Sequence, residues 1–202
     1  MGFFSELFSR KEKSVPSENL EKINTLEKTN PDFDALRDFC SIILMNKHQD
    51  VIKQCVKTME NDNESIADIL LILSGYDDVG CVLRDAALID NDSYMISSDC
   101  GAPDLRSFFD YVDSLKKGRN LDFNYDEEKF SKDRAMDKWM AELVPQLTDL
   151  HILVFDGASD IYHYIIVNKE TGDKAKVLFE KMAQHITSYK YTADYINENF
   201  AD

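Results

Sequence analysis

Cysteine is scarce in this sequence of 202 residues, and its cysteines are never closely spaced. A small secreted domain that depends on disulfides carries denser cysteines, and a structural zinc site needs closer ligand pairs. The sequence therefore argues against both classes. We expect reduced thiols that mostly fill the core, at Cys40, Cys55, Cys81 and Cys100.

Glycine is also rare, with seven in the whole chain. No G-x-x-x-x-G-K stretch is present to cradle a phosphate, and no G-x-S-x-G stretch to present a nucleophilic serine. The sequence therefore predicts no cofactor, and it favours a binding role over catalysis.

Long apolar runs are missing as well. No run approaches the roughly 18 residues that a membrane-spanning helix needs. The start of the chain lacks the basic stretch and long apolar stretch of a secretory signal. We therefore expect a cytoplasmic protein.

Basic residues are outnumbered, because 23 lysines and arginines face 38 acidic residues and the formal net charge is -15. A chain this acidic repels phosphate backbones, which argues against nucleic-acid binding. Net charge also keeps a small protein soluble without any further role. The alternative is that the charge favours association with the basic surface of a partner protein.

Residues 1–30 differ from the rest, because their five basic and five acidic residues cancel. They open with an apolar stripe at helical spacing, followed by basic residues: Phe3, Phe4, Leu7 and Phe8, then Arg10, Lys11 and Lys13. Such a stripe can dock on a membrane or in a partner's groove, but two helical turns are marginal in water. We predict an N-terminal amphipathic segment and linker over residues 1–30, without membrane contact, and a single acidic domain over 31–202.

Apolar residues recur with helical spacing along much of this domain. The spacing predicts helices over residues 30–46, 48–60, 103–118, 135–147 and 171–186, and a short helix over 192–200. Asn30 is the expected N-cap of the first helix, with Pro31 in its first turn.

Strand signals are fewer. The dense apolar run Ile69–Leu73 is short, which predicts a buried strand. Residues 150–155 and 161–167 suit strands, and the short loop between them requires an antiparallel hairpin. Residues 79–99 allow a helix followed by a strand, or a second hairpin. The sequence thus predicts an α+β fold, with helices packed on a small mixed or antiparallel sheet and a C-terminal hairpin followed by a helix.

Two motifs are candidates for the turn of this hairpin, in "LVFDGASD", and a third is a candidate for the acidic stretch at residues 90–95. The turn resembles the D-x-D-G-T motif of haloacid-dehalogenase phosphohydrolases, but their nucleophilic carboxylate would fall at Val154. The hydroxyl ligands of a D-x-S-x-S metal site would fall at Ala158 and Asp160. A calcium loop at residues 90–95 fails because Met95 stands where glycine is required.

Pairing Asp156 with Asp160 places His151 and His163 together on one face of the hairpin. Two histidines and a carboxylate can bind a metal ion, so a metal-dependent hydrolase remains the alternative function. It would use Asp156, Asp160, His151 and His163. No H-x-H or H-E-x-x-H pattern supports it, and the sequence predicts no metal site.

The opposite face of the hairpin is a candidate binding surface, because tyrosine anchors interfaces well. It consists of Asp156, Asp160, Tyr162 and Tyr164. The acidic stretch 90–104 adds a second set with an exposed or half-exposed tyrosine: Asp92, Tyr94, Asp99 and Asp104. The sequence therefore predicts a non-enzymatic domain that binds a basic protein.

A strand, the residues D-G-x-S-D-x-Y from Asp156 to Tyr162, a second strand and a helix resemble the C-terminal part of small uncharacterised bacterial domains. This resemblance implies an α+β fold and no known reaction. In acidity and size the chain also resembles immunity proteins of polymorphic toxins, which implies a toxin as the basic partner.

Overall fold

The computed structural model describes residues 30–75, 93–98, 104–132, 136–157 and 161–197. The chain divides into two compact units, residues 1–30 and Pro31–Asp202. Every helix and strand of the described residues belongs to the second unit. The predicted amphipathic segment lies outside the described residues.

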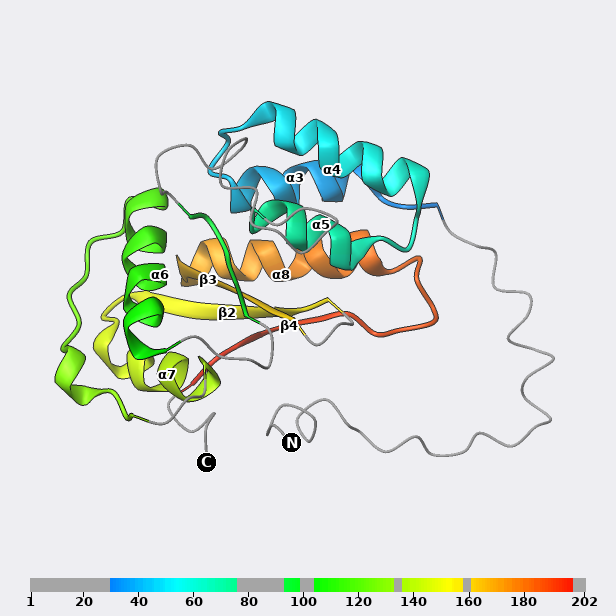
Figure 1. Ribbon diagram of the computed structural model, residues 1–202. Coiled ribbons are helices and arrows are strands. Elements are labelled where there is room, and N and C mark those ends of the chain that lie inside the picture. The colour runs from blue at the N-terminus through cyan, green and yellow to red at the C-terminus, as the bar shows by residue number, and fades with distance from the viewer. Residues whose placement is uncertain (1–29, 76–92, 99–103, 133–135, 158–160, 198–202) are drawn as a thin grey trace, which may run out of the picture. The chain divides into compact units, whose positions relative to one another are not determined.

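Six α-helices and four strands form the described part of the chain (Figure 1). The helices are α3 (Phe33–Ile43), α4 (Gln49–Asn61), α5 (Ile66–Leu73), α6 (Leu105–Gly118), α7 (Met136–Leu143) and α8 (Lys169–Ala183). The strands are β1 (Ile96–Ser98), β2 (Leu150–Asp156), β3 (Tyr162–Asn168) and β4 (Thr192–Tyr195), and two short 3-10 turns span Glu127–Lys129 and Val144–Gln146.

The four strands form one sheet in the order β1-β3-β2-β4, and every pairing is antiparallel. The prediction of an α+β fold is therefore confirmed, as is the C-terminal hairpin followed by a helix.

None of the helices in the described ranges has the length and apolar character needed to cross a bilayer.

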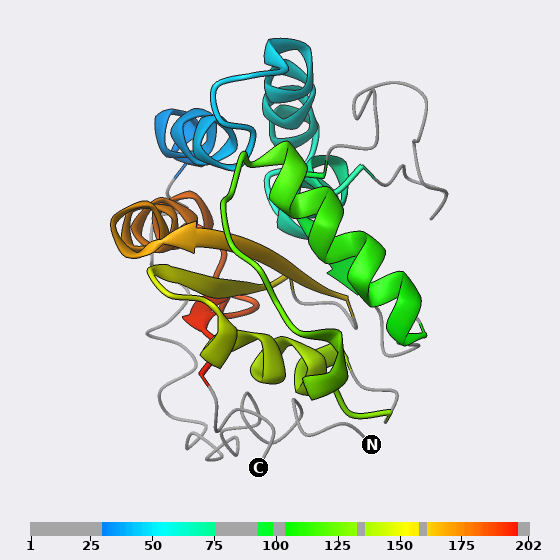
Figure 2. The same cartoon turned by 90° about the vertical axis from the view of Figure 1, so that its left-hand side faces the viewer.

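The sheet has helices on both sides (Figures 1 and 2). Helices α3, α4, α5 and α8 lie on one side and α7 on the other, while α6 runs past the edge formed by β1. Side chains alternate along the strands, so the hairpin packs apolar side chains against helices on both sides of the sheet. We call the core on the side of α3, α4, α5 and α8 the first core. Leu153, Phe155, Ile165 and Val167 enter the first core, where the Phe155 ring lies 5.3 Å from that of Phe39 and 5.1 Å from that of Phe179.

The prediction of a strand at Ile69–Leu73 is wrong, because these residues form the last turns of helix α5. The helix follows a tight turn in which Ser65 Oγ donates to the Asp62 carbonyl at 2.6 Å. Most of its residues are buried, and a helix buried on nearly every side is apolar all round. Such a run has no periodicity that separates it from a buried strand.

The prediction of a helix at 192–200 is also wrong, since Thr192–Tyr195 is strand β4. Its backbone pairs with β2, and Ala193 points into the core while Asp194 stays exposed. The outer edge of β2 offers unpaired backbone groups, and pairing with them outweighs a weak helical pattern. Residues 198–200 lie outside the described residues.

The predicted helix starts are nearly right, with one corrected cap. Asp32, not Asn30, caps α3, because its Oδ1 accepts the Ala35 N–H at 2.9 Å. Gly118 is the last residue of α6, at the predicted end of this helix. A β-carbon at this position would collide with the carbonyl oxygen of Ser93, so only glycine permits the close approach.

The cysteines that can be placed behave as core residues. Cys40 and Cys55 are free thiols, and both are completely buried between α3 and α4. Cys81 and Cys100 lie outside the described residues.

Candidate functional site

The hairpin pairs Asp156 with Tyr162 and Phe155 with His163. The predicted pairing of Asp156 with Asp160 is therefore wrong by two residues, and the connection between the strands is longer than expected. Because a shift by two keeps every side chain on its face, the predicted division of the hairpin into two faces still holds.

Two tyrosines of the predicted binding surfaces are buried. Tyr164 is 1% exposed, since its face of the sheet is covered, and Tyr94 is 3% exposed. The Tyr94 hydroxyl lies 3.2 Å from His48 Nε2, and its carbonyl accepts from Arg119 at 3.1 Å. The expected exposure of Tyr94 is thus wrong, and Tyr164 contributes no surface.

The predicted aspartates have different positions. Asp104 caps α6, because its Oδ1 accepts the Ser107 N–H at 2.8 Å. This hydrogen bond is the main reason that the pKa of Asp104 is lowered. Asp92, Asp99 and Asp160 lie outside the described residues. Asp156 is the last residue of β2 and accepts a hydrogen bond from Tyr189.

The described residues of the alternative metal site, Asp156, His151 and His163, are not brought together. His151 is exposed near the start of β2, with its ring 5.6 Å from that of Tyr195, while His163 is buried at the other end of the hairpin. Asp156 points to the opposite face of the sheet from both histidines. Among the described residues, no group of three histidine, cysteine or acidic side chains is arranged to hold a metal ion.

His163 instead takes part in a buried hydrogen-bond network. Its Nδ1 lies 2.6 Å from Ser97 Oγ and 3.1 Å from Ser74 Oγ. Ser74 donates to the Leu70 carbonyl at 2.6 Å and Ser97 donates to Ser74, so both hydroxyl protons are used. We therefore assign the imidazole proton to Nδ1. Nε2 has no partner within the described part of the chain, and burial lowers the pKa of His163 to about 3.

The structure connects the predicted site residue Asp156 to an exposed tyrosine. Asp156 is 4% exposed, and its carboxylate accepts a hydrogen bond of 2.7 Å from the hydroxyl of Tyr189, which is 39% exposed. Tyr189 follows α8 and precedes β4. Burial, followed by this hydrogen bond, raises the pKa of Tyr189 above its ordinary value.

Tyr191 stands beside Tyr189, with the ring centroids 5.1 Å apart and the planes at 69°. Burial raises the pKa of Tyr191, and so do nearby negative charges, in the order Glu64, Asp156, Asp62 and Asp68. The turn before α5 is held against this region, because His185 contacts the carbonyl oxygen of Asn63. We call the six residues Asp62, Glu64, Asp68, Asp156, Tyr189 and Tyr191 the acidic tyrosine surface.

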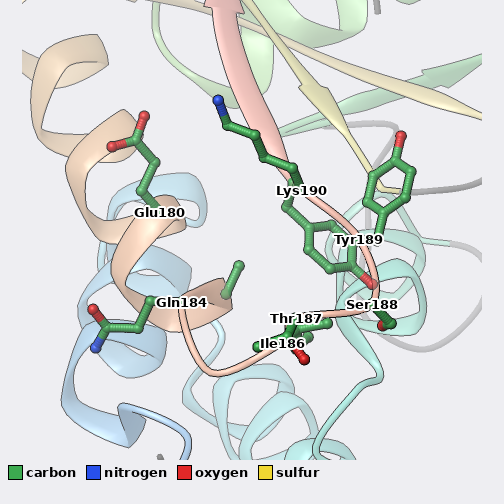
Figure 3. Close-up of a pocket in the computed structure, with 9 residues that line it drawn as sticks. Glu180, Gln184, Ile186, Thr187, Ser188, Tyr189 and Lys190 are labelled. Atoms are coloured by element: carbon green, nitrogen blue, oxygen red, sulfur yellow. The ribbon is translucent and has the colours of Figure 1, made fainter. Parts of the chain in front are cut away.

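A pocket of about 470 Å³ opens beside the two tyrosines (Figure 3). Glu180 lines it from α8 and Gln184 from the C-cap directly after this helix, while Tyr189 and Lys190 line it from the segment that leads to β4. Thr187 and Ser188 add hydroxyls at the turn between these walls. The pocket therefore has aromatic, carboxylate, amide and hydroxyl groups in reach of a single bound side chain.

Sequence reasoning missed both tyrosines of this surface. Tyr189 is 33 residues from Asp156 in the chain, and no motif links the two. The stretch Tyr189-Lys190-Tyr191 just before β4 alternates aromatic and polar residues, which is typical of a strand. That alternation is the local signal that the two aromatic side chains lie on the same side of the chain.

Residues 35–189 match the model of a family described as a domain of unknown function, DUF6630. The match covers well over half of the chain. The chain belongs to the DUF6630 family. The matched range runs from α3 to Tyr189, so this domain includes the hairpin, the turn before α5 and the first tyrosine of the surface. No curated protein and no solved structure gives a significant match to the chain.

Proposed function

We propose that this DUF6630 domain is a non-enzymatic binding module that captures a basic segment of a partner protein on the acidic tyrosine surface. One observation carries the proposal. The exposed Tyr189 and the partly exposed Tyr191 lie beside three exposed carboxylates and the buried Asp156, and these groups come from three distant parts of the chain. Aromatic groups at such a surface are typical anchors of protein interfaces.

The carboxylates and the tyrosines have separate tasks in this proposal. Asp62, Glu64 and Asp68 are exposed, so their charge attracts a basic partner and favours the correct orientation on approach. The half-exposed ring of Tyr189 supplies apolar contact area that carries more of the affinity. A bare acidic surface would attract cations equally well but would lack such an anchor.

A more specific form of the proposal takes the partner to be a toxin that the domain neutralises in the cytoplasm. The net charge of -15, the chain length and the low cysteine content support it. The same features suit an immunity protein, which blocks a basic toxin by covering its surface.

Charge reversal tests the proposal directly. The full chain is used to capture proteins from the native cell, at low and at high salt, as wild type and as the double variant Glu64→Lys/Asp68→Lys. Both residues are exposed, so the variant should fold. We expect a basic partner that is retained at low salt, weakened by high salt and lost with the variant.

The double variant Asp110→Lys/Glu128→Lys is the matched control. It makes the same charge change on exposed residues of α6 and the turn after it, away from the acidic tyrosine surface. It should retain the partner. If both double variants weaken capture equally, net charge alone explains the binding and the proposed surface is wrong. If neither does, the proposal fails.

A further inference from the structure

We infer that the pocket beside Tyr189 is a receptor for a single arginine side chain of the partner, with the guanidinium stacked on the tyrosine pair. The inference rests on the proposed function, because the pocket adjoins the acidic tyrosine surface. The ligand is then an arginine side chain, it lies between the two rings, and each variant of the lining should change its affinity in a stated direction.

The two rings form walls of the kind that bind a cation. Their planes meet at 69° with centroids 5.1 Å apart, so together they bound a corner instead of a flat surface. A cation over the face of a tyrosine is attracted by the negative face of the ring. The Tyr189 hydroxyl donates to Asp156 at 2.7 Å, and a hydrogen bond to a carboxylate pushes electron density back into that ring.

Both rings are held in place before any ligand arrives. Tyr189 is fixed by its hydrogen bond to the buried Asp156, and Tyr191 lies with its ring 6.4 Å from that of Phe179, which is completely buried. A preorganised pair of rings loses little conformational entropy on binding. This makes the corner a better receptor than two exposed tyrosines on a free loop.

The remaining lining favours arginine over lysine. A guanidinium carries five N–H donors in one plane, whereas an ammonium is a strongly hydrated point charge. The pocket offers acceptors on several sides, namely the Glu180 carboxylate, the Gln184 amide and the hydroxyls of Thr187 and Ser188. Planar stacking on tyrosine together with hydrogen bonds in several directions suits the guanidinium.

Among the described residues, Lys190 is the one cation that lines the pocket, and its charge opposes that of the ligand. Its side chain extends away from the Tyr189 ring, toward the side of the pocket where the Glu180 carboxylate points (Figure 3). This leaves the ring corner open but places a like charge near a bound guanidinium. Removal of the Lys190 charge should therefore tighten arginine binding, while removal of the Glu180 charge should weaken it.

Titration calorimetry with the full chain tests the inference. The probes are three short glycine peptides with one central residue, which is arginine, lysine or citrulline, the neutral isostere of arginine. We expect the arginine peptide to bind about tenfold more tightly than the citrulline peptide, and more tightly than the lysine peptide. Equal binding of arginine and citrulline, or lysine binding that matches arginine, would overturn the inference.

Variants of the lining residues give effects of opposite sign. Tyr189→Ala should weaken arginine binding about tenfold, and Glu180→Gln should weaken it about threefold. Lys190→Gln should tighten it about threefold. Tyr111→Ala, at a tyrosine of α6 with similar exposure, should change nothing. Glu180 and Lys190 are exposed, so their variants stay informative even if Tyr189→Ala is poorly folded.

The outcomes separate this inference from the proposed function. If a basic partner is captured in a salt-dependent way while the arginine peptide does not bind, the inference fails and the proposed function stands. If the arginine peptide binds with the expected variant effects while no partner is captured, the proposed function fails and the receptor stands. A Lys190→Gln variant that leaves arginine binding unchanged would contradict the proposed place of the guanidinium.

Discussion

Two polar clusters of the hairpin region differ in how completely protein groups surround them. Toward the end where β3 leads into α8, Arg119 is buried and donates three hydrogen bonds to backbone carbonyls: Ile43 at 2.7 Å, Tyr94 at 3.1 Å and Ile166 at 3.1 Å. Near the turn between the strands, Asp156 is also buried, but its tyrosine partner reaches the surface. We call the cluster around Arg119 closed, and the cluster of Asp156 and Tyr189 open.

The difference shows which polar residues support the fold and which lie where a partner can reach them. Arg119 joins α3, the stretch before β1 and strand β3, so its charge is used to hold three elements together. Burial lowers the pKa of Arg119 to about 10, yet it remains charged near neutral pH. Three of the carboxylates around Tyr191, those of Asp62, Glu64 and Asp68, lie at the surface, where their charge can act on an approaching molecule.

The largest expected effect is at the closed cluster. Arg119→Met keeps the length of the side chain but leaves three carbonyls without their donor. It should lower the free energy of unfolding by about 3 kcal/mol, as measured by urea denaturation. Arg37→Met is the control, because the Arg37–Asp34 pair is exposed and should contribute less than about 1 kcal/mol. Equal effects at both positions would remove the distinction between the clusters.

An intermediate effect is expected at His163. This residue lies near Asp156 of the open cluster, but it is as buried as Arg119. Its folded pKa of about 3 lies below the ordinary value of 6.5, so the folded state excludes a proton that the unfolded chain accepts. This contribution to stability is present above pH 6.5 and is lost progressively as the pH falls toward 3. The loss should be about 1.4 kcal/mol per pH unit below 6.5.

The change of stability with pH isolates this contribution. Between neutral pH and about pH 5, the wild type should lose about 2 kcal/mol more than a His163→Gln variant. His151→Gln, at an exposed histidine, should follow the wild type. Parallel pH profiles for the wild type and His163→Gln would show that His163 accepts a proton in the folded state, and would contradict a closed environment.

The smallest expected effect is at Asp104, which the sequence suggested as a binding residue and the structure shows as a helix cap. Asp104→Ala should lower the free energy of unfolding by about 1 kcal/mol through the lost N-cap of α6. Asp32→Ala, at the cap of α3, should cost about the same. Neither variant should change partner capture. A loss of capture with Asp104→Ala alone would extend the binding surface to α6.

Several features were available from the sequence because short-range patterns fix them. Helical spacing located α3, α4, α6, α7 and α8. The short connection between two β-rich stretches required an antiparallel hairpin. The division of the hairpin into two faces survived a wrong pairing, because faces depend only on alternation. The composition likewise set the negative charge that the proposed function uses.

The rest depended on which elements meet. Ile69–Leu73 belongs to the helix that begins at Ile66 and packs into the first core, where an enclosed apolar run shows no helical periodicity in the sequence. Thr192–Tyr195 becomes a strand because β2 offers an edge to pair with. Tyr94 and Tyr164 are buried because helices cover both sides of the sheet. The meeting of Asp156 with Tyr189 and Tyr191 spans more than thirty residues of chain, and no local pattern encodes such a contact. The sequence by itself therefore determined the elements, the faces and the charge, while only the tertiary structure decided which carboxylates and tyrosines share a surface, because that depends on contacts distant in the chain.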